Sequence, residues 1–328
     1  MSTSHYNVST LETEIESPIW MLCINVLLAT IGTCANLSVV IVFINCKIHR
    51  RSFPYLLVFQ QSLIDLLANC LFLIFYFVYP VAAEKSNDIY CKSSKMYYFF
   101  LSASSLNLVF ISVERYIAVV HPFQYRIRRN NKRNMLPQLS LPFIAAFLIT
   151  FHSVFLVEPY PKHLCISYTK IEVFRIYSGT IYFLNVLGPI CVMIFCYYRI
   201  YVTLTKQFKV RAELTNQSSQ NRTTTAGDND QNAPDVEMSN SPIQSYQVNK
   251  AQRNFIDTML INTLIYIVCN APLAFLFLVD TICEIYIHYL FTYIFALMML
   301  LNTAANPFVY AYKFNDYRIG LSKTFCCR

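Results

Sequence analysis

The sequence has little charge and very little glycine. Only 13% of its 328 residues are Asp, Glu, Lys or Arg, and five are glycine, whereas soluble domains are about 25% charged. The shortage of charge excludes an ordinary water-soluble surface. The shortage of glycine disfavours a transporter or channel, because such proteins bind substrates and ions at broken, Gly-rich or Pro-rich helices.

Clustered histidines are also absent. The six histidines lie far apart, so no pair has the spacing of a metal-binding motif; they are His5, His49, His121, His152, His163 and His288. This scatter argues against a membrane metal hydrolase and, with no other catalytic pattern present, predicts that the protein is not an enzyme and has no cofactor.

Long apolar stretches dominate what remains. Seven stretches carry at most one charged residue, at 17–46, 52–83, 96–113, 134–157, 176–198, 258–279 and 285–312. A membrane-crossing helix needs about 20 such residues, and lipid tolerates only helices or closed barrels. The short third stretch is extended by Lys95, whose side chain reaches toward the interface. We therefore predict an all-α membrane protein, a seven-transmembrane helix bundle over 19–312.

Basic residues predict the orientation of the bundle. Six of the 26 Lys and Arg residues lie in loops on one side, and the other twenty lie on the opposite side. Basic loops stay in the cytoplasm, so residues 1–18 are expected outside a multi-pass protein of the plasma membrane. The net charge of +8 then reflects contact with anionic membrane lipids and not nucleic-acid binding. Asn7 heads an N-x-S glycosylation sequence on the outer side.

Two polar segments flank the last spans on the cytoplasmic side. In 212–249, 20 of 38 residues are Ser, Thr, Asn or Gln, which predicts a disordered third cytoplasmic loop. This loop is either a spacer or a phosphorylation platform. Residues 313–328 carry apolar side chains among basic ones, which predicts a short amphipathic helix on the membrane. Cys326 and Cys327 follow it and are candidates for palmitoylation.

Charged and polar motifs stand at the ends of two apolar stretches. Glu114-Arg115-Tyr116 follows the third stretch, where charges are costly and usually functional, and Asn306-Pro307 with Tyr310 closes the seventh. With further matches in order, the chain resembles the rhodopsin-like (class A) G-protein-coupled receptors over about nine-tenths of its length. The other matching positions are Asn36, Asp65, Pro122, Phe123, Pro189, Tyr197 and Pro272.

The chain departs from this family at several positions. The tryptophan of the sixth-helix motif is replaced by Asn270, the common acid at the start of that helix is Gln252, and Trp20 is the sole tryptophan, so the fourth-helix tryptophan is missing. Cys91 also stands one residue closer to Arg115 than is usual. The resemblance is therefore to a divergent member.

The resemblance implies an outer disulfide between Cys91 and Cys165. It also implies a sodium site, with oxygen ligands from Asp65, Ser104, Asn302 and Asn306. The alternative for Asp65 is a protonated carboxyl group in a polar network with Asn36, because a lone carboxylate in the membrane needs a partner or a proton.

The family also assigns roles in coupling. Arg115, which always keeps its proton, is restrained by Glu114 at rest and is released on activation to meet the G protein and Tyr197. Tyr116, Asn306, Pro307 and Tyr310 complete the coupling group. Partners implied by the family are an extracellular ligand, a heterotrimeric G protein, and arrestin and receptor kinases acting through the third cytoplasmic loop.

The family places a ligand pocket among apolar and aromatic side chains. Amine receptors carry an aspartate where Tyr97 stands, and opsins carry a retinal-binding lysine where Leu300 stands. A small amine and a Schiff base are therefore disfavoured, and a peptide or lipid-like ligand is favoured. The alternative function is a multi-span transporter or channel. The predicted pocket residues are Tyr97, Tyr98, Leu101, Ile181, Asn185, Leu273, Phe277, Ala296 and Leu300.

Overall fold

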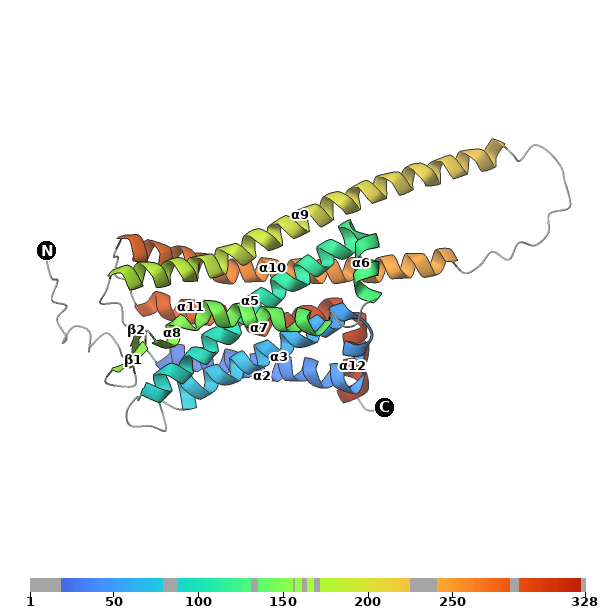
Figure 1. Ribbon diagram of the computed structural model, residues 1–328. Helices are drawn as coiled ribbons and strands as arrows, with labels where there is room; N and C mark the ends of the chain where they lie inside the picture. The colour runs from blue at the N-terminus through green and yellow to red at the C-terminus, as the bar shows by residue number, and fades with distance from the viewer. Residues whose placement is uncertain are drawn as a thin grey trace.

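The computed structural model describes residues 19–78, 88–130, 135–155, 157–160, 164–167, 172–224, 241–283 and 289–325. Seven long helices in this part of the chain lie side by side as an elongated bundle (Figure 1). They are α2 (Ile19–Asn45), α3 (Phe53–Leu73), α5 (Asp88–Val120), α7 (Met135–Thr150), α9 (Glu172–Thr224), α10 (Ser241–Cys283) and α11 (Tyr289–Lys313). The predicted all-α bundle is confirmed.

Short elements connect or extend these helices. They are η1 (Ile48–Arg50), the π-helix η2 (Ile74–Val78), α6 (Pro122–Asn130), α8 (His152–Phe155), β1 (Val157–Tyr160), β2 (Leu164–Ser167) and α12 (Asn315–Phe325). Strands β1 and β2 pair antiparallel, a hairpin that the sequence did not predict. The hairpin lies at one end of the bundle, which we call the hairpin end, and α6 and α12 lie at the other, the α12 end (Figure 1).

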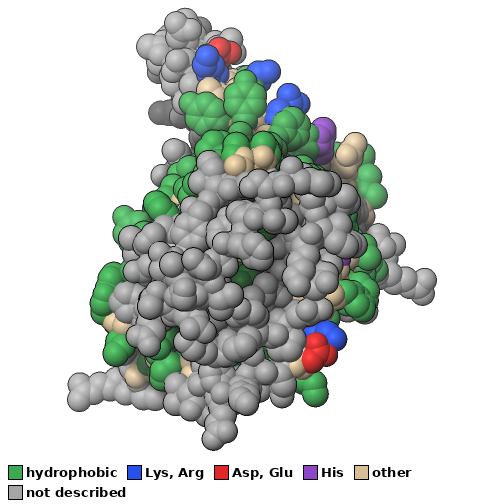
Figure 2. All heavy atoms as spheres, turned by 90° about the vertical axis from the view of Figure 1, so that its left-hand side faces the viewer, with side chains coloured by type: hydrophobic (Ala, Val, Ile, Leu, Met, Phe, Trp, Pro, Cys, Tyr) green, Lys and Arg blue, Asp and Glu red, His purple; other side chains and the backbone are tan. Residues whose placement is uncertain are grey.

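The helices have the length and composition of membrane spans. Six of them meet both requirements within the described residues, over Ile19–Asn45, Phe53–Val78, Asp88–Val120, Pro137–Phe155, Ile176–Gln207 and Asn254–Val279. The seventh, α11, is 25 residues long. Seen from the hairpin end, hydrophobic side chains cover the flanks of the bundle (Figure 2). Large apolar side chains such as Leu27, Leu148 and Phe275 are exposed, as a lipid environment requires.

The packing order places α5 at the centre of the bundle. Helices α2, α3, α5, α9, α10 and α11 each contact the next, α11 closes the ring against α2, and α7 packs on the outside of α5. Because α5 has neighbours on several sides, its polar residues Ser104, Asn107 and Arg115 are buried. This arrangement sets the positions of the candidate sites.

The predicted loop at 212–249 needs correction at both ends. Helix α9 continues to Thr224 and α10 begins at Ser241, so helical backbone covers 212–224 and 241–249. A helix satisfies its own backbone hydrogen bonds, and Gln, Glu, Leu and Ala are acceptable helix formers, so a polar composition does not itself end a helix. Residues 225–240, which include Gly227 and Pro234, lie outside the described part of the chain.

Helix α12 packs across the ends of α2 and α3. Tyr55 donates to Asp316 over 2.7 Å and Arg51 pairs with the same carboxylate at 3.0 Å. The Ser38 and Tyr317 hydroxyls lie 2.9 Å apart. A Cβ on Gly320 would lie 2.6 Å from Cγ1 of Val42, so α12 approaches α2 as closely as a glycine permits. The predicted C-terminal helix is thus present and docked.

Candidate functional site

A buried polar network surrounds Asp65 at the middle of the bundle. Its carboxylate has no exposed surface. Ser104 of α5 donates to Oδ1 at 2.7 Å, and Nδ2 of Asn306, on α11, donates to Oδ2 at 2.7 Å. The structure therefore brings together three of the four predicted sodium ligands, from three helices. The fourth, Asn302, is buried one turn before Asn306, and its Oδ1 has no hydrogen-bond partner within the described residues.

Gln61 is a member of this network that sequence reasoning missed. Its Nε2 lies 3.2 and 3.1 Å from the two oxygens of Asp65 and 2.6 Å from Oγ of Ser104. An amide nitrogen with its two hydrogens thus lies among the oxygens that a cation would need. Because an N–H group and a cation compete for the same lone pairs, this arrangement does not fit a sodium ion. The sequence did contain a signal for this contact, because Gln61 stands one helical turn before Asp65 in an apolar stretch.

The alternative expectation places a protonated Asp65 in a polar network with Asn36. Asn36 donates to the backbone oxygens of Gly32 and Thr303, at 2.9 and 3.0 Å. Thr303 donates to Oδ1 of Asn69 at 3.3 Å, and Asn69 donates to the backbone oxygen of Asp65 at 2.7 Å. Asn36 therefore joins the network indirectly and ties α2 to α11.

Arg115 lies near the α12 end, where it is buried and packs against an aromatic ring. Its Cζ lies 4.6 Å from the ring centroid of Phe255, on α10. Phe255 and Tyr310 both stack on Phe314, with ring centroids 5.2 and 5.4 Å from that of Phe314. Tyr55 contacts both phenylalanines edge-on. The guanidinium therefore caps an aromatic cluster built from α3, α10, α11 and Phe314, which lies between α11 and α12.

The predicted restraint of Arg115 by Glu114 stays a prediction. Glu114 and Arg115 are both buried, and they are neighbours on α5. Arg115 also contacts α10 through Phe255.

The other coupling residues lie near Arg115 or on adjoining helices. Tyr197 of α9 is buried and accepts a hydrogen bond of 3.4 Å from Ser112, one turn before Arg115. Tyr310 is fully buried, while Tyr116 is directed toward His121 and Phe195. Pro307 lies inside α11, as Pro189 and Pro272 lie inside α9 and α10, where proline removes a helical hydrogen bond.

Part of the predicted ligand pocket forms one aromatic cluster nearer the hairpin end. Tyr97 packs against Phe72, Tyr76 and Tyr98, with ring centroids 5.4–5.6 Å apart. Leu101 and Leu300 pack in the same cluster. Phe72 and Tyr76 were not predicted, because neither carries a motif. The ammonium group of Lys95 lies 5.3 Å from the centroid of the Tyr98 ring.

The remaining predicted pocket residues come from α9, α10 and α11. Nδ2 of Asn185 donates to Ser102 of α5 at 3.0 Å, which places this face of α9 beside Leu101. Phe277 contacts Tyr182 with centroids 4.8 Å apart. Leu273 is buried and Ile181 is half-buried. Ala296 lies within α11, but its side chain is outside the described part.

The hairpin packs on the start of α5. Cys91 is disulfide-bonded, has no exposed surface and lies with Tyr90 and Val157 of β1 in one apolar cluster. Cys165 lies on β2 opposite Pro159, but its side chain is outside the described part, so its pairing with Cys91 stays a prediction.

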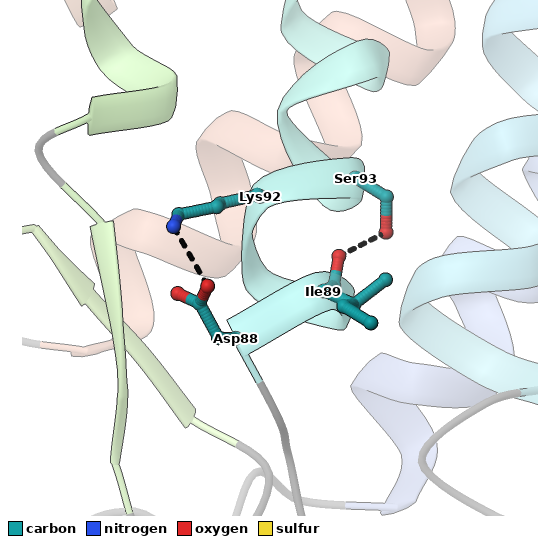
Figure 3. A network of polar contacts seen from close by, with 4 residues as sticks. All are labelled: Asp88, Ile89, Lys92 and Ser93. Atoms are coloured by element: carbon teal, nitrogen blue, oxygen red, sulfur yellow. Dashed lines mark hydrogen bonds and ion pairs between the residues drawn. The ribbon is translucent and has the colours of Figure 1, made fainter.

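Beside the hairpin, Lys92 and Asp88 form an ion pair of 2.7 Å in the first turn of α5, where Ser93 donates to the Ile89 carbonyl (Figure 3).

Three predicted modification sites lie outside the described residues: Asn7, Cys326 and Cys327. Glycosylation and palmitoylation therefore stay predictions.

Comparison with known proteins decides the family. Residues 35–310 match the family described as 7 transmembrane receptor (rhodopsin family). The chain belongs to this family. It is 25% identical to human trace amine-associated receptor 1 over 288 residues, covering 81% of this chain and 75% of that receptor. It is 24% identical to Xenopus laevis neuropeptide Y receptor type 1 over 192 residues, covering 54% and 52% of the two chains, and 26% identical to Drosophila melanogaster octopamine receptor beta-1R over 243 residues, covering 69% and 45%.

Membership gives the matched residues a common setting. The rhodopsin-family match spans α2 to α11 and so includes Asp65, Arg115, Asn306 and Tyr310. This rhodopsin-family receptor is thus a multi-pass membrane protein in which the aromatic cluster, the Asp65 network and the Arg115 contact lie along one bundle, in that order from the hairpin end.

Proposed function

We propose that this receptor binds an extracellular ligand at the hairpin end and activates a heterotrimeric G protein at the α12 end. The observation that carries the proposal is the burial of Arg115 against Phe255. A permanently charged guanidinium is costly to bury, and here it is held by an aromatic face on another helix. Movement of α10 would remove that face and expose Arg115 to a partner.

The ligand region favours a peptide or lipid-like ligand. Tyr97, Tyr98, Phe72 and Tyr76 supply aromatic surface, and the charged residues buried within the described part of the chain are Asp65, Glu114 and Arg115, none of which belongs to the aromatic cluster. A small cationic amine would therefore lack a carboxylate partner there. The relatives are named for different ligand classes, trace amines and neuropeptide Y. The proposed ligand class therefore rests on the side chains of this receptor.

Buried polar atoms indicate where such a ligand would be fixed. The hydroxyl groups of Tyr97 and Tyr182 and the side-chain oxygen of Asn185 are buried without a hydrogen-bond partner among the described residues. Leaving such groups unsatisfied costs about 1–3 kcal/mol each. A ligand that offers amide or hydroxyl groups beside an apolar body would satisfy them, as a peptide or a polar lipid does.

Nucleotide exchange tests the proposal directly. Membranes containing the receptor are assayed with a panel of G proteins, and peptide, lipid and amine libraries are screened by the same measurement. We expect at least one peptide or lipid to accelerate exchange, and Arg115→Gln to abolish the response at matched surface expression. Arg126→Gln is the control, because Arg126 is an exposed cation on α6 at the same end.

The alternative function, a transporter or channel, predicts other results. It requires solute uptake or conductance that persists in Arg115→Gln and is unaffected by G proteins. A response to small amines that is lost in Tyr97→Phe would contradict the proposed ligand class while leaving the receptor assignment intact.

Arrestin and receptor kinases, acting through the segment between α9 and α10, are the further partners that we propose.

A further inference from the structure

The nitrogen of the Gln61 side chain lies between the oxygens that a bound cation would otherwise share. It is within 3.2 Å of both Asp65 oxygens and 2.6 Å from Oγ of Ser104. Gln61, Asp65 and Ser104 have almost no exposed surface, so bulk solvent does not compete for these bonds. The carboxylate therefore already has donors from three side chains on three helices: Gln61, Ser104 and Asn306.

The orientation of the Gln61 amide follows from its neighbours. The backbone oxygen of Leu57 only accepts hydrogen bonds, and it lies 3.3 Å from Nδ2 of Asn107. The same Nδ2 lies 2.8 Å from Oε1 of Gln61, so Asn107 is a donor to both. With Oε1 held as the acceptor, the nitrogen of Gln61 must face Asp65. A flipped Gln61 would place its oxygen against the Asp65 carboxylate and its nitrogen against the Nδ2 donor of Asn107.

We propose that Gln61, held by Asn107, is a built-in substitute for the sodium ion, so that this receptor joins α3, α5 and α11 around Asp65 without a bound cation. An N–H donor and a cation both stabilise a carboxylate, but the donor is covalently attached and always present. The stability and resting state of this receptor are therefore independent of sodium.

Removing the amide should create the site that it blocks. In Gln61→Leu, Asp65, Ser104, Asn302 and Asn306 keep their oxygens, which are ligands that a hard cation prefers, and Asp65 loses one donor. A ligand that binds only the folded state raises its stability. Sodium should therefore stabilise Gln61→Leu although it does not stabilise the wild type.

The test is thermal unfolding of the purified full-length receptor in sodium, potassium or choline chloride at constant ionic strength. The wild type should show the same midpoint in all three salts. Gln61→Leu should have a lower midpoint that rises by about 2 °C or more in sodium alone. The double variant Gln61→Leu/Asp65→Asn should lose this rise.

Gln60→Leu is the matched control. Gln60 is also buried on α3, but its Nε2 donates to the Leu139 carbonyl on α7, at 2.9 Å. Its loss should lower the midpoint equally in all three salts. Asn107→Leu, which removes the group that orients Gln61, should show a weaker sodium response of the same sign as Gln61→Leu.

Two results would overturn the proposal. One is a sodium-specific rise in the wild type that disappears in Asp65→Asn. The other is a folded Gln61→Leu variant with no sodium response. If Gln61→Leu does not fold, the wild-type comparison still decides, since it needs no variant except Asp65→Asn. The measurement involves neither ligand nor G protein, so its outcome is separate from that of the proposed function.

Discussion

At the scale of single residues, Arg115 shows how a buried charge can be held by an aromatic ring on another helix. Its guanidinium packs on Phe255 at 4.6 Å. A cation–π contact contributes about 0.5–2 kcal/mol, more where it is desolvated. This contact joins α5 to α10, so its loss should favour arrangements in which α10 has moved away.

Phe255→Ala should therefore raise nucleotide exchange in the absence of ligand. A loss of about 0.5–2 kcal/mol corresponds to roughly a two- to thirtyfold larger active population. The measurement is basal exchange at matched surface expression. Phe255→Tyr keeps an aromatic face and should stay near the wild type, and Glu114→Gln should have a smaller effect than Phe255→Ala. If Glu114→Gln had the larger effect, the neighbouring acid would be the main restraint after all.

Polar residues inside apolar stretches show where prediction from the sequence reached its limit. Asp65, Ser104 and Asn306 were predicted to meet, because each matches a family motif, and they do meet. Gln61 and Asn107 match no motif, and only the packing of α3 on α5 brings them together. A sequence shows that a buried amide needs a partner, but not which helix supplies it.

At the scale of elements, apolar length predicted the helices well but not their ends. The stretch at 96–113 became α5, which runs from Asp88 to Val120, because a polar turn can continue a helix beyond the membrane. The hairpin β1–β2 was missed because its eight residues carry no alternating pattern; its position depends on contacts with α5.

Helix α12 provides a test at this scale. Gly320→Ala would place a Cβ 2.6 Å from Val42, so α12 or α2 must shift, and overpacking typically costs about 1–3 kcal/mol. We expect the midpoint of thermal unfolding to fall by several degrees. Gly188→Ala is the control, because a Cβ there meets nothing within 4 Å and alanine is the better helix former. Equal midpoints for the two variants would show that α12 is not tightly docked.

The disulfide of Cys91 is a second test between elements. Loss of a native disulfide typically costs about 2–5 kcal/mol, so Cys91→Ser should reduce the amount of receptor at the cell surface. If Cys165 is the partner, Cys165→Ser should reduce the surface amount as much as Cys91→Ser does. The double variant should reduce it hardly further than either single variant. Cys283→Ser is the control, since Cys283 is a free, exposed cysteine. Additive losses would show that Cys91 and Cys165 act separately.

At the scale of the whole molecule, three layers of side chains follow one another along the bundle. Aromatic residues lie nearer the hairpin end, the Asp65 network lies at the middle, and Arg115 lies near the α12 end. Helices α3 and α5 contribute to all three layers, through Tyr76 and Tyr97, then Asp65 and Ser104, then Tyr55 and Arg115. Two helices therefore run through all three layers, which is the physical connection that the proposed two-ended function requires.

The orientation of these layers in the membrane depends on charge. Basic residues gather where α9 rises above the bundle, at the top of Figure 2, and the sequence predicts twenty of the 26 on the cytoplasmic side. Basic segments remain in the cytoplasm, so the hairpin end should face outward. A tag fused before Met1 should then be stained on intact cells, and a tag after Arg328 only after permeabilisation.

Glycosylation gives an independent check on the same orientation. Asn7 and Asn221 both head N-x-S or N-x-T sequences, but they lie on opposite sides of the predicted topology, and glycans are added only on the outer side. Asn7→Gln should abolish the mass shift that a glycosidase produces, whereas Asn221→Gln should leave it unchanged. The opposite pattern, or surface staining of the C-terminal tag, would reverse the orientation and place the Arg115 layer outside the cell, where no G protein could reach it.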